Sequence, residues 1–252
     1  MDYTEINARA WDALALAGNE WAKPISTKEY KRAKSGALEL YLTPTKPVPA
    51  QWFPPLKDAR VLCLASGGGQ QGPVFAAHGA QVTVTDISEK QLEMERKVAQ
   101  REGYEITALK ADMASPFPFA DAAFDLIFNP ISNCYIADVQ HQWNECSRVL
   151  KPGGRLLTGF CKEELFLFDF DWQQDPPLVV RNPLPFTTTQ KEGGEWNVGM
   201  AGSVAFSHTL AEQIGGQLRA GFALMDLYED RDRSGVFARY MNSYAATCAV
   251  KK

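Results

Sequence analysis

Three consecutive glycines at positions 67–69 form the sharpest local signal in the sequence. They follow a short apolar run directly, and together with Gly72 they satisfy the spacing GxGxxG. Glycines at such a turn let the backbone bend sharply and approach a ligand closely, because no Cβ stands in the way. The spacing suits a nicotinamide dinucleotide and S-adenosylmethionine equally well, so the turn alone does not choose between the two cofactors.

A carboxylate stands at the end of the next predicted strand. Asp86 closes the run AQVTVTD. A carboxylate at this place accepts hydrogen bonds from both hydroxyls of a ribose. Asp86 therefore supports an adenosine-containing cofactor, again without distinguishing the two candidates.

The elements that must position these residues begin at Arg60. Short apolar runs alternate with amphipathic stretches from there on, which is typical of βα units that feed a parallel sheet. The expected strands are 60–65, 80–86, 105–109, 124–129 and 155–160.

Capping and breaking signals place the helices between these strands. Ser88 and Gln91 predict a capping box at the start of a helix that runs to Gln100, and Pro73 suits the first turn of another helix. A helix over 139–150 should end at the breaker Lys-Pro-Gly-Gly that follows it.

The remaining chain divides around this core. Residues 1–58 read as a helical extension or lid that closes in a Pro-rich boundary, and 59–160 as the cofactor-binding core. Residues 161–206 read as an irregular insertion that shapes the acceptor pocket, with a possible strand at LFLFDFDW. Residues 207–252 add a helix and two strands. The prediction is an α/β fold, Rossmann-like and doubly wound, with a mostly parallel seven-stranded sheet whose last strand is antiparallel.

Composition excludes several function classes. The 26 Lys and Arg residues against 30 Asp and Glu give a net charge of -4, so no basic field is expected to hold nucleic acid. The start of the chain does not resemble a secretory signal and no run has the length of a membrane span, so a cytoplasmic protein without membrane contact is expected. The five cysteines are scattered and never form CxxC, which argues against a metal site and a disulfide framework.

Residues 59–160 resemble the class I S-adenosylmethionine-dependent methyltransferases. The resemblance rests on the glycine turn, on LKADMASPFPFADAAFDLIF with its Asp and Met after the third strand, and above all on WNECSRVLKPGGRLLTGF. It implies S-adenosylmethionine as cofactor, S-adenosylhomocysteine as product and a small-molecule methyl acceptor. The core residues that it implies for cofactor binding are Ser66, Gly67, Gly68, Gly69, Asp86, Ile87, Asp112, Met113, Asn129 and Pro130.

Two residues depart from the family pattern. The family usually has an acidic residue where Cys63 stands and glycine where Ala65 stands. The first departure concerns how the amino group of the methionine moiety is held. The second requires a backbone conformation at residue 65 that a Cβ tolerates.

The acceptor and any general base are not identified by the sequence. Transfer to an already nucleophilic atom needs mainly alignment and exclusion of water. A hydroxyl or an acid needs a base, for which Tyr135, His141 and His208 are candidates. Among the many aromatic residues of the extension and the insertion, Trp11 and Trp21 are expected to contact the ligands.

Two alternatives remain open at this stage. An NAD(P)-dependent oxidoreductase would use the same glycine turn, but the Tyr-Lys relay YxxxK is missing from the sequence. A non-catalytic S-adenosylmethionine-binding protein would fit if the two departures had weakened the site. The methylated atom and the oligomeric state stay undetermined.

Overall fold

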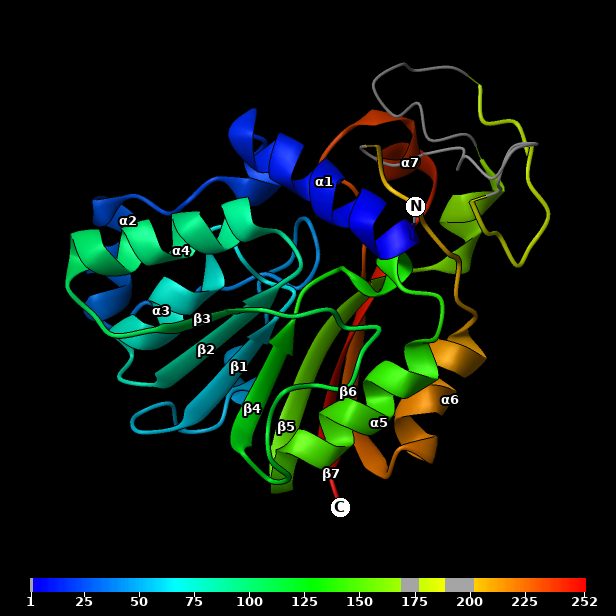
Figure 1. Cartoon of the computed structure of the whole chain (residues 1–252). Helices are drawn as coiled ribbons and strands as arrows, with labels where there is room; N and C mark the ends of the chain where they lie inside the picture. Colours follow the sequence, from blue (N-terminus) through cyan, green and yellow to red (C-terminus); the bar gives the residue numbers. More distant parts are fainter. Residues whose placement is uncertain (1, 169–176, 189–201) are drawn as a thin grey trace.

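A seven-stranded sheet forms the centre of the protein in a computed structural model that describes residues 2–168, 177–188 and 202–252 (Figure 1). The strand order is β3-β2-β1-β4-β5-β7-β6. Strand β7 is antiparallel to both of its neighbours, and the other strands all run parallel to one another. The predicted fold class is therefore confirmed, including the antiparallel last strand. The strands are β1 Arg60–Leu64, β2 Gln81–Asp86, β3 Thr107–Lys110, β4 Phe124–Asn129, β5 Leu150–Cys161, β6 Phe222–Asp230 and β7 Tyr244–Lys251.

Alternate residues of the central strands enter two different cores. Val61 and Cys63 of β1 belong to one buried cluster, whereas Leu62 and Leu64 belong to the other. Helices α3 (Gln71–Ala77) and α4 (Glu89–Glu102) cover the first face, and α5 (Val139–Val149) and α6 (Leu210–Arg219) cover the second (Figure 1). A strand buried on both faces reads as a continuous apolar run, which explains why the sequence located these strands.

The N-terminal region packs against two helices of the core. Helix α1 (Tyr3–Leu16) lies against α4, and α2 (Thr27–Lys34) lies against α3. The Pro-rich passage that was predicted as a boundary lies in the first core, where Trp52 and Phe53 are buried. The indole N–H of Trp52 also donates to Asp226 on β6, at 2.8 Å. The Pro-rich passage thus covers a part of the sheet and belongs to the core of the domain.

Two local predictions were wrong in detail. Ser88 accepts a hydrogen bond from Gln91 N as expected, but no reciprocal bond completes the capping box, because Ser88 N donates to Asp86 instead. The predicted breaker at 151–154 belongs to β5, which begins at Leu150. The chain passes through it with Gly153 at φ 76° and an irregular register opposite Phe124 and Leu126.

The predicted insertion is only partly described. A 3₁₀ helix, Glu163–Leu167, replaces the first half of the possible strand at LFLFDFDW, and the second half lies outside the described residues. Beyond β6, the short helix α7 (Gly235–Tyr240) leads into β7. Within the described ranges, no helix combines the length and the apolar character needed to cross a bilayer.

Candidate active site

A cavity of ≈ 1560 Å³ opens at the carboxyl ends of the parallel strands, where α/β sheets bind their ligands. Ordinary ligand sites measure about 300–1,000 Å³, so this cavity has room for a cofactor and a second molecule together. Its walls come from the N-terminal region, the glycine turn, and the segments that follow β2, β3 and β4. The predicted residues that line it are Trp11, Trp21, Ser66, Gly67, Asp86, Ile87, Asp112, Met113, Pro130 and Tyr135.

The N–H groups of the glycine turn all bond to the protein itself. Those of residues 67, 68 and 69 donate to Asp86 Oδ2 at 3.0 Å, to the Gln91 carbonyl at 3.0 Å and to Glu95 Oε2 at 2.7 Å. Gly68 and Gly69 have φ of 97° and 76°, a region in which glycine carries no Cβ penalty. Neither of these two glycines lines the cavity, in contrast to Gly67.

The carbonyl groups of Ser66 and Gly67 are left for a ligand, whereas that of Gly69 accepts from Ile25 N. In a trans peptide the C=O points opposite to the N–H, so the oxygens of Ser66 and Gly67 face away from Asp86 and α4. Within the described part of the chain, no donor bonds to either oxygen. A surface of carbonyl oxygens accepts a cation such as an ammonium group. It does not suit a pyrophosphate, which needs N–H donors that this turn has already used.

Asp86 lies at the centre of the site with both carboxylate oxygens engaged. Oδ2 accepts from Gly67 N, and Oδ1 accepts from Ser88 N at 2.8 Å. Burial raises the pKa of Asp86 to about 6, against the lowering effect of these backbone bonds. The group is thus ionised at neutral pH, and each oxygen keeps a lone pair for a ribose hydroxyl.

Ala65 adopts the conformation in which the family usually has glycine. Its φ of 46° lies in the left-handed region. Alanine can occupy this region, at a cost of roughly 1–2 kcal/mol relative to a right-handed conformation. The sequence predicted a backbone conformation at residue 65 that a Cβ tolerates. Ala65 does adopt such a conformation, but with this cost in free energy.

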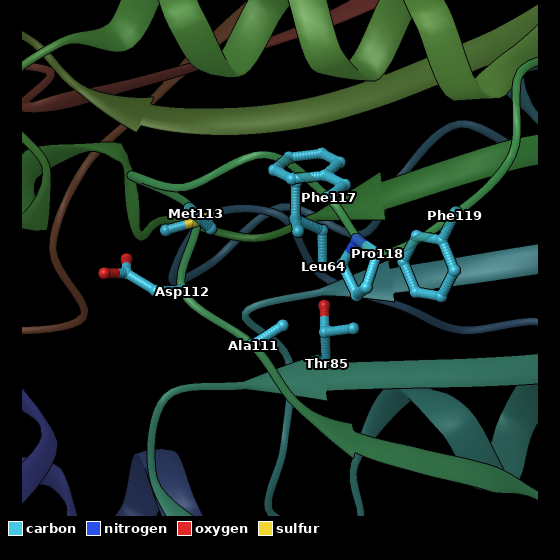
Figure 2. Close-up of a pocket in the computed structure, with 8 residues that line it drawn as sticks. All are labelled: Leu64, Thr85, Ala111, Asp112, Met113, Phe117, Pro118 and Phe119. Atoms are coloured by element: carbon cyan, nitrogen blue, oxygen red, sulfur yellow. The ribbon is translucent and has the colours of Figure 1, made fainter.

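Asp112 and Met113 lie between the large cavity and a small apolar hollow beside it (Figure 2). Figure 2 shows the Asp112 carboxylate directed away from the rings of Phe117 and Phe119, which bound the hollow. One Asp112 oxygen accepts from Ala114 N at 2.9 Å, which fixes the side chain after β3. The pair thus offers an acid and an apolar side chain on one wall of the cavity.

The Asn129 side chain is part of the scaffold. It is fully buried, donates to the Leu64 carbonyl and to Ser132, and accepts from Gln142 and Thr158. The amide is therefore fully used within the protein, and this predicted cofactor residue does not line the cavity. Its neighbour Pro130 does line the cavity.

The predicted bases differ in position. His208 does not line the cavity; its Nε2 contacts the carbonyls of Ile136 (2.9 Å) and Asn133 (3.2 Å), and burial lowers its pKa. His141 also lies outside the cavity lining, with Nε2 buried rather than solvated. Tyr135 lines the cavity, but burial holds the pKa of its hydroxyl well above the ordinary value. A hydroxyl of this kind can accept a proton only if its own proton passes on to a neighbouring acceptor.

Sequence reasoning missed a tyrosine–carboxylate pair at the same end of the cavity. Tyr244, the first residue of β7, lines the cavity and donates its hydroxyl proton to Asp232 Oδ1 at 2.8 Å. Asp232 Oδ2 is buried and has no partner among the described residues. Burial raises the pKa of Asp232, which makes the carboxylate a stronger base. The sequence offered no local motif for this pair, because the fold brings the C-terminal strand to the site.

The N-terminal region closes over the glycine turn. Gln70 donates to the carbonyls of Glu20 and Lys23, and Ile25 N donates to the Gly69 carbonyl. The half-exposed Trp21 ring lies under the Arg233 guanidinium, at 4.8 Å from the ring centre.

Trp11 approaches the site from α1. Its ring meets the Tyr135 ring edge to face, at 5.6 Å between centres. Both predicted tryptophans thus border the cavity, at separate places.

Comparisons with known proteins agree with this arrangement. Residues 62–158 match the model of a methyltransferase domain. An uncharacterized methyltransferase of Bacillus subtilis, YbaJ, is 41% identical over 248 residues and is covered over 97% of both chains.

Solved structures share the fold. A putative S-adenosylmethionine-dependent methyltransferase of Listeria monocytogenes aligns with a TM-score of 0.63 at 18% identity, over 80% of this chain and 94% of its own. The 1,6-didemethyltoxoflavin-N1-methyltransferase of Burkholderia thailandensis, solved with S-adenosylhomocysteine, aligns with a TM-score of 0.61 at 14% identity, over 99% of this chain and 89% of its own. The chain belongs to the class I S-adenosylmethionine-dependent methyltransferases.

Proposed function

We propose that this methyltransferase transfers the methyl group of S-adenosylmethionine directly to an apolar or aromatic small molecule. The observation that carries the proposal is a single cavity of ≈ 1560 Å³ with two chemically different ends. One end combines the glycine turn with Asp86, Asp112 and Met113, another part carries aromatic and aliphatic side chains, and charged side chains of the N-terminal region such as Arg32 and Glu39 line the rest.

The polar end fits the cofactor in each of its parts. The carbonyls of Ser66 and Gly67 would hold the amino group, and Asp86 would hold the ribose hydroxyls. Asp112 with Met113 would flank the adenine. This arrangement would compensate for Cys63, which stands where the family usually has an acidic residue. An ammonium group needs oxygen atoms to bind, and the turn supplies them without a carboxylate from β1.

The other end fits an uncharged acceptor. Trp11, Tyr135, Tyr244, Leu42 and Ile131 line it. Sites lined by aromatic and aliphatic groups with a few polar atoms bind small organic molecules. The likeness in fold to a methyltransferase named for 1,6-didemethyltoxoflavin, over 99% of this chain, agrees with an acceptor of this size.

The chain's contribution to the reaction is alignment and exclusion of water. The cofactor supplies an electrophilic methyl group on its sulfonium. The protein holds the acceptor in line with it, in a cavity that the N-terminal region covers.

Acceptors that carry a proton on the reacting atom require a base, and the Tyr244–Asp232 pair supplies one. As the new carbon–oxygen bond forms and the carbon–sulfur bond breaks, the acceptor proton moves to Tyr244 Oη. The Tyr244 proton moves to Asp232 Oδ1 along the 2.8 Å hydrogen bond. The sulfur would keep the electron pair of the broken bond, and Asp232 would later release its proton to water, which returns the Tyr244–Asp232 pair to its starting state.

A methylation screen tests this function. The protein is incubated with methyl-labelled S-adenosylmethionine and a panel of aromatic and aliphatic alcohols, phenols, amines and thiols, and labelled products are identified by mass spectrometry. We expect turnover of a hydroxyl-bearing acceptor that falls about 100-fold in Tyr244→Phe, since general base catalysis contributes about 10²–10⁴-fold.

The matched control is Tyr228→Phe. This tyrosine lies on the neighbouring strand β6 and does not line the cavity. Its substitution should leave turnover unchanged. Turnover only on proteins or nucleic acids would refute the proposed acceptor class, and an unchanged rate in Tyr244→Phe would refute the role of the pair.

A further inference from the structure

A fully buried carboxyl group lies behind the glycine turn. Glu95 of α4 is 0% exposed. Its Oε2 accepts from Gly69 N at 2.7 Å, whereas its Oε1 is buried and has no partner among the described residues. A buried carboxyl group with one unpaired oxygen costs free energy of folding. A group that costs stability at this place calls for a functional explanation.

The surroundings of Glu95 do not neutralise it. The titratable groups that face it are the Cys63 thiol on β1, the Asp86 carboxylate on β2 and the Tyr104 hydroxyl beyond α4. No Lys or Arg in the described ranges forms an ion pair with it. Cys63 and Glu95 are near enough to interact electrostatically, so β1 and α4 approach the same point behind the turn.

The turn needs an external group to fix its orientation. Gly68 and Gly69 both have left-handed φ values, and glycine peptides in this region rotate with little steric resistance. In the described part of the chain Gly69 N bonds only to Glu95, so this bond selects which way the peptide between residues 68 and 69 faces. Gly72 is also fitted to the carboxyl group, because a Cβ there would lie 2.3 Å from Glu95 Oε1.

We propose that Glu95 is a positioning residue for the cofactor: by holding Gly69 N–H it anchors the peptide between residues 68 and 69 to α4, and so holds in place the turn whose Ser66 and Gly67 carbonyl oxygens would meet the amino end of S-adenosylmethionine. The inference rests on the proposed placement of the cofactor. Glu95 does not touch the cofactor itself, since it does not line the cavity. A carboxyl group from α4 thus orients the turn in a chain whose strand β1 carries Cys63 near the same point.

The protonation state of Glu95 should then affect cofactor affinity. Burial raises its pKa to about 8, with a smaller contribution from the charge on Asp86. The ionised group accepts the Gly69 bond more strongly than the neutral acid, because charge-assisted bonds are roughly twice as strong. The affinity of the wild type for the cofactor should therefore increase as the pH rises through about 8 and Glu95 ionises. The affinity of Glu95→Gln should show no such increase.

Calorimetric titration of the full chain with S-adenosylhomocysteine tests the inference without a known acceptor. Glu95→Ala should weaken binding by about 10- to 100-fold, as expected for the loss of a hydrogen bond to a charged group. Glu95→Gln should bind nearly as well as wild type at pH 6.5 and progressively worse than wild type by pH 9. The matched control is Glu93→Gln, two residues earlier on the same helix and exposed, which should bind as wild type does at every pH.

Moving the carboxylate provides a further readout. In Cys63→Asp/Glu95→Ala the acid is returned to the same region from β1, and most of the lost affinity should return. A purely structural role for Glu95 predicts no such rescue. Thermal unfolding of each variant shows whether it is folded, and Glu95→Gln carries the test if Glu95→Ala does not fold.

The outcomes separate the two proposals. Wild type that fails to bind S-adenosylhomocysteine would refute the proposed cofactor site. Wild type that binds, together with Glu95 variants that bind equally well across the whole pH range, would refute the role of Glu95 alone.

Discussion

The buried Glu95 carboxyl group makes the protein less stable as the pH rises, and Glu95→Gln should remove this dependence. The pKa of Glu95 is raised from 4.5 to about 8 in the folded chain. Between these values the folded state binds more protons than the unfolded state. Stability is therefore complete below the unfolded pKa and is lost as the pH rises through the folded pKa.

The size of the effect follows from the two pKa values. Between pH 5.5 and pH 7.5, ionisation of Glu95 in the unfolded chain removes roughly 2–3 kcal/mol of unfolding free energy, since each pKa unit corresponds to about 1.4 kcal/mol. Asp86, with its pKa raised from 3.8 to about 6, removes a further ~1 kcal/mol over the same range. The Asp86 effect and the opposite effect of His208, whose pKa is lowered, are common to wild type and variant.

Urea unfolding at pH 5.5 and pH 7.5 measures the difference. The wild type should lose roughly 2–3 kcal/mol more than Glu95→Gln between the two pH values. Equal losses in the two proteins would show that Glu95 does not titrate in this range. A wild type that loses less than the variant would reverse the sign of the reasoning.

Glycine substitutions test the packing that positions the site. In Gly159→Ala the new Cβ would lie 2.1 Å from the Leu42 carbonyl oxygen, so the melting temperature should fall by about 4–12 °C, for roughly 2–3 kcal/mol. An unchanged melting temperature would contradict the close approach of the N-terminal region to β5. In Gly216→Ala the Cβ would lie 2.5 Å from the Trp143 ring, and about 1–3 kcal/mol should be lost. The adjacent Gly215→Ala meets only the mobile end of a side chain and should gain about 0.5–1 kcal/mol from helix propensity, so equal effects of the two substitutions would refute this packing.

The sheet could be predicted because its central strands are buried on both faces. Such strands read as uninterrupted apolar runs, and parallel strands imply that their carboxyl ends share one edge. The glycine turn, Asp86 and Asp112 each follow a strand and therefore fall at this edge together. Strand β5 was predicted too short, since a Pro-Gly-Gly run that ends helices can also continue as irregular strand.

The residues that sequence reasoning missed are those that act through tertiary structure. Tyr244 reaches the cavity, with Asp232 hydrogen-bonded behind it, only because β7 inserts antiparallel beside β5, which no local pattern predicts. Glu95 carried a weak signal, because it stands between Leu92 and Val98 on the apolar stripe of its helix. A charged residue on the apolar face of a helix is buried and needs a hydrogen-bonding partner. The position of Glu95 could therefore have predicted that it contacts the backbone of a neighbouring segment such as the glycine turn.

The sequence also could not predict which backbone groups of the glycine turn, N–H or C=O, face the ligand. The spacing GxGxxG says that a ligand can approach the backbone, but it does not say whether N–H or C=O groups face that ligand. The three N–H bonds to Asp86, Gln91 and Glu95 decide it, and two of these three partners come from α4.

A crystal structure of the complex with S-adenosylhomocysteine tests this polarity most directly. We predict the amino group of the ligand within about 3 Å of the carbonyl oxygens of Ser66 or Gly67, the distance of a hydrogen bond, with both ribose hydroxyls on Asp86. A ligand whose carboxylate, rather than its amino group, lies on the turn, with the bond between Gly69 and Glu95 broken, would contradict it.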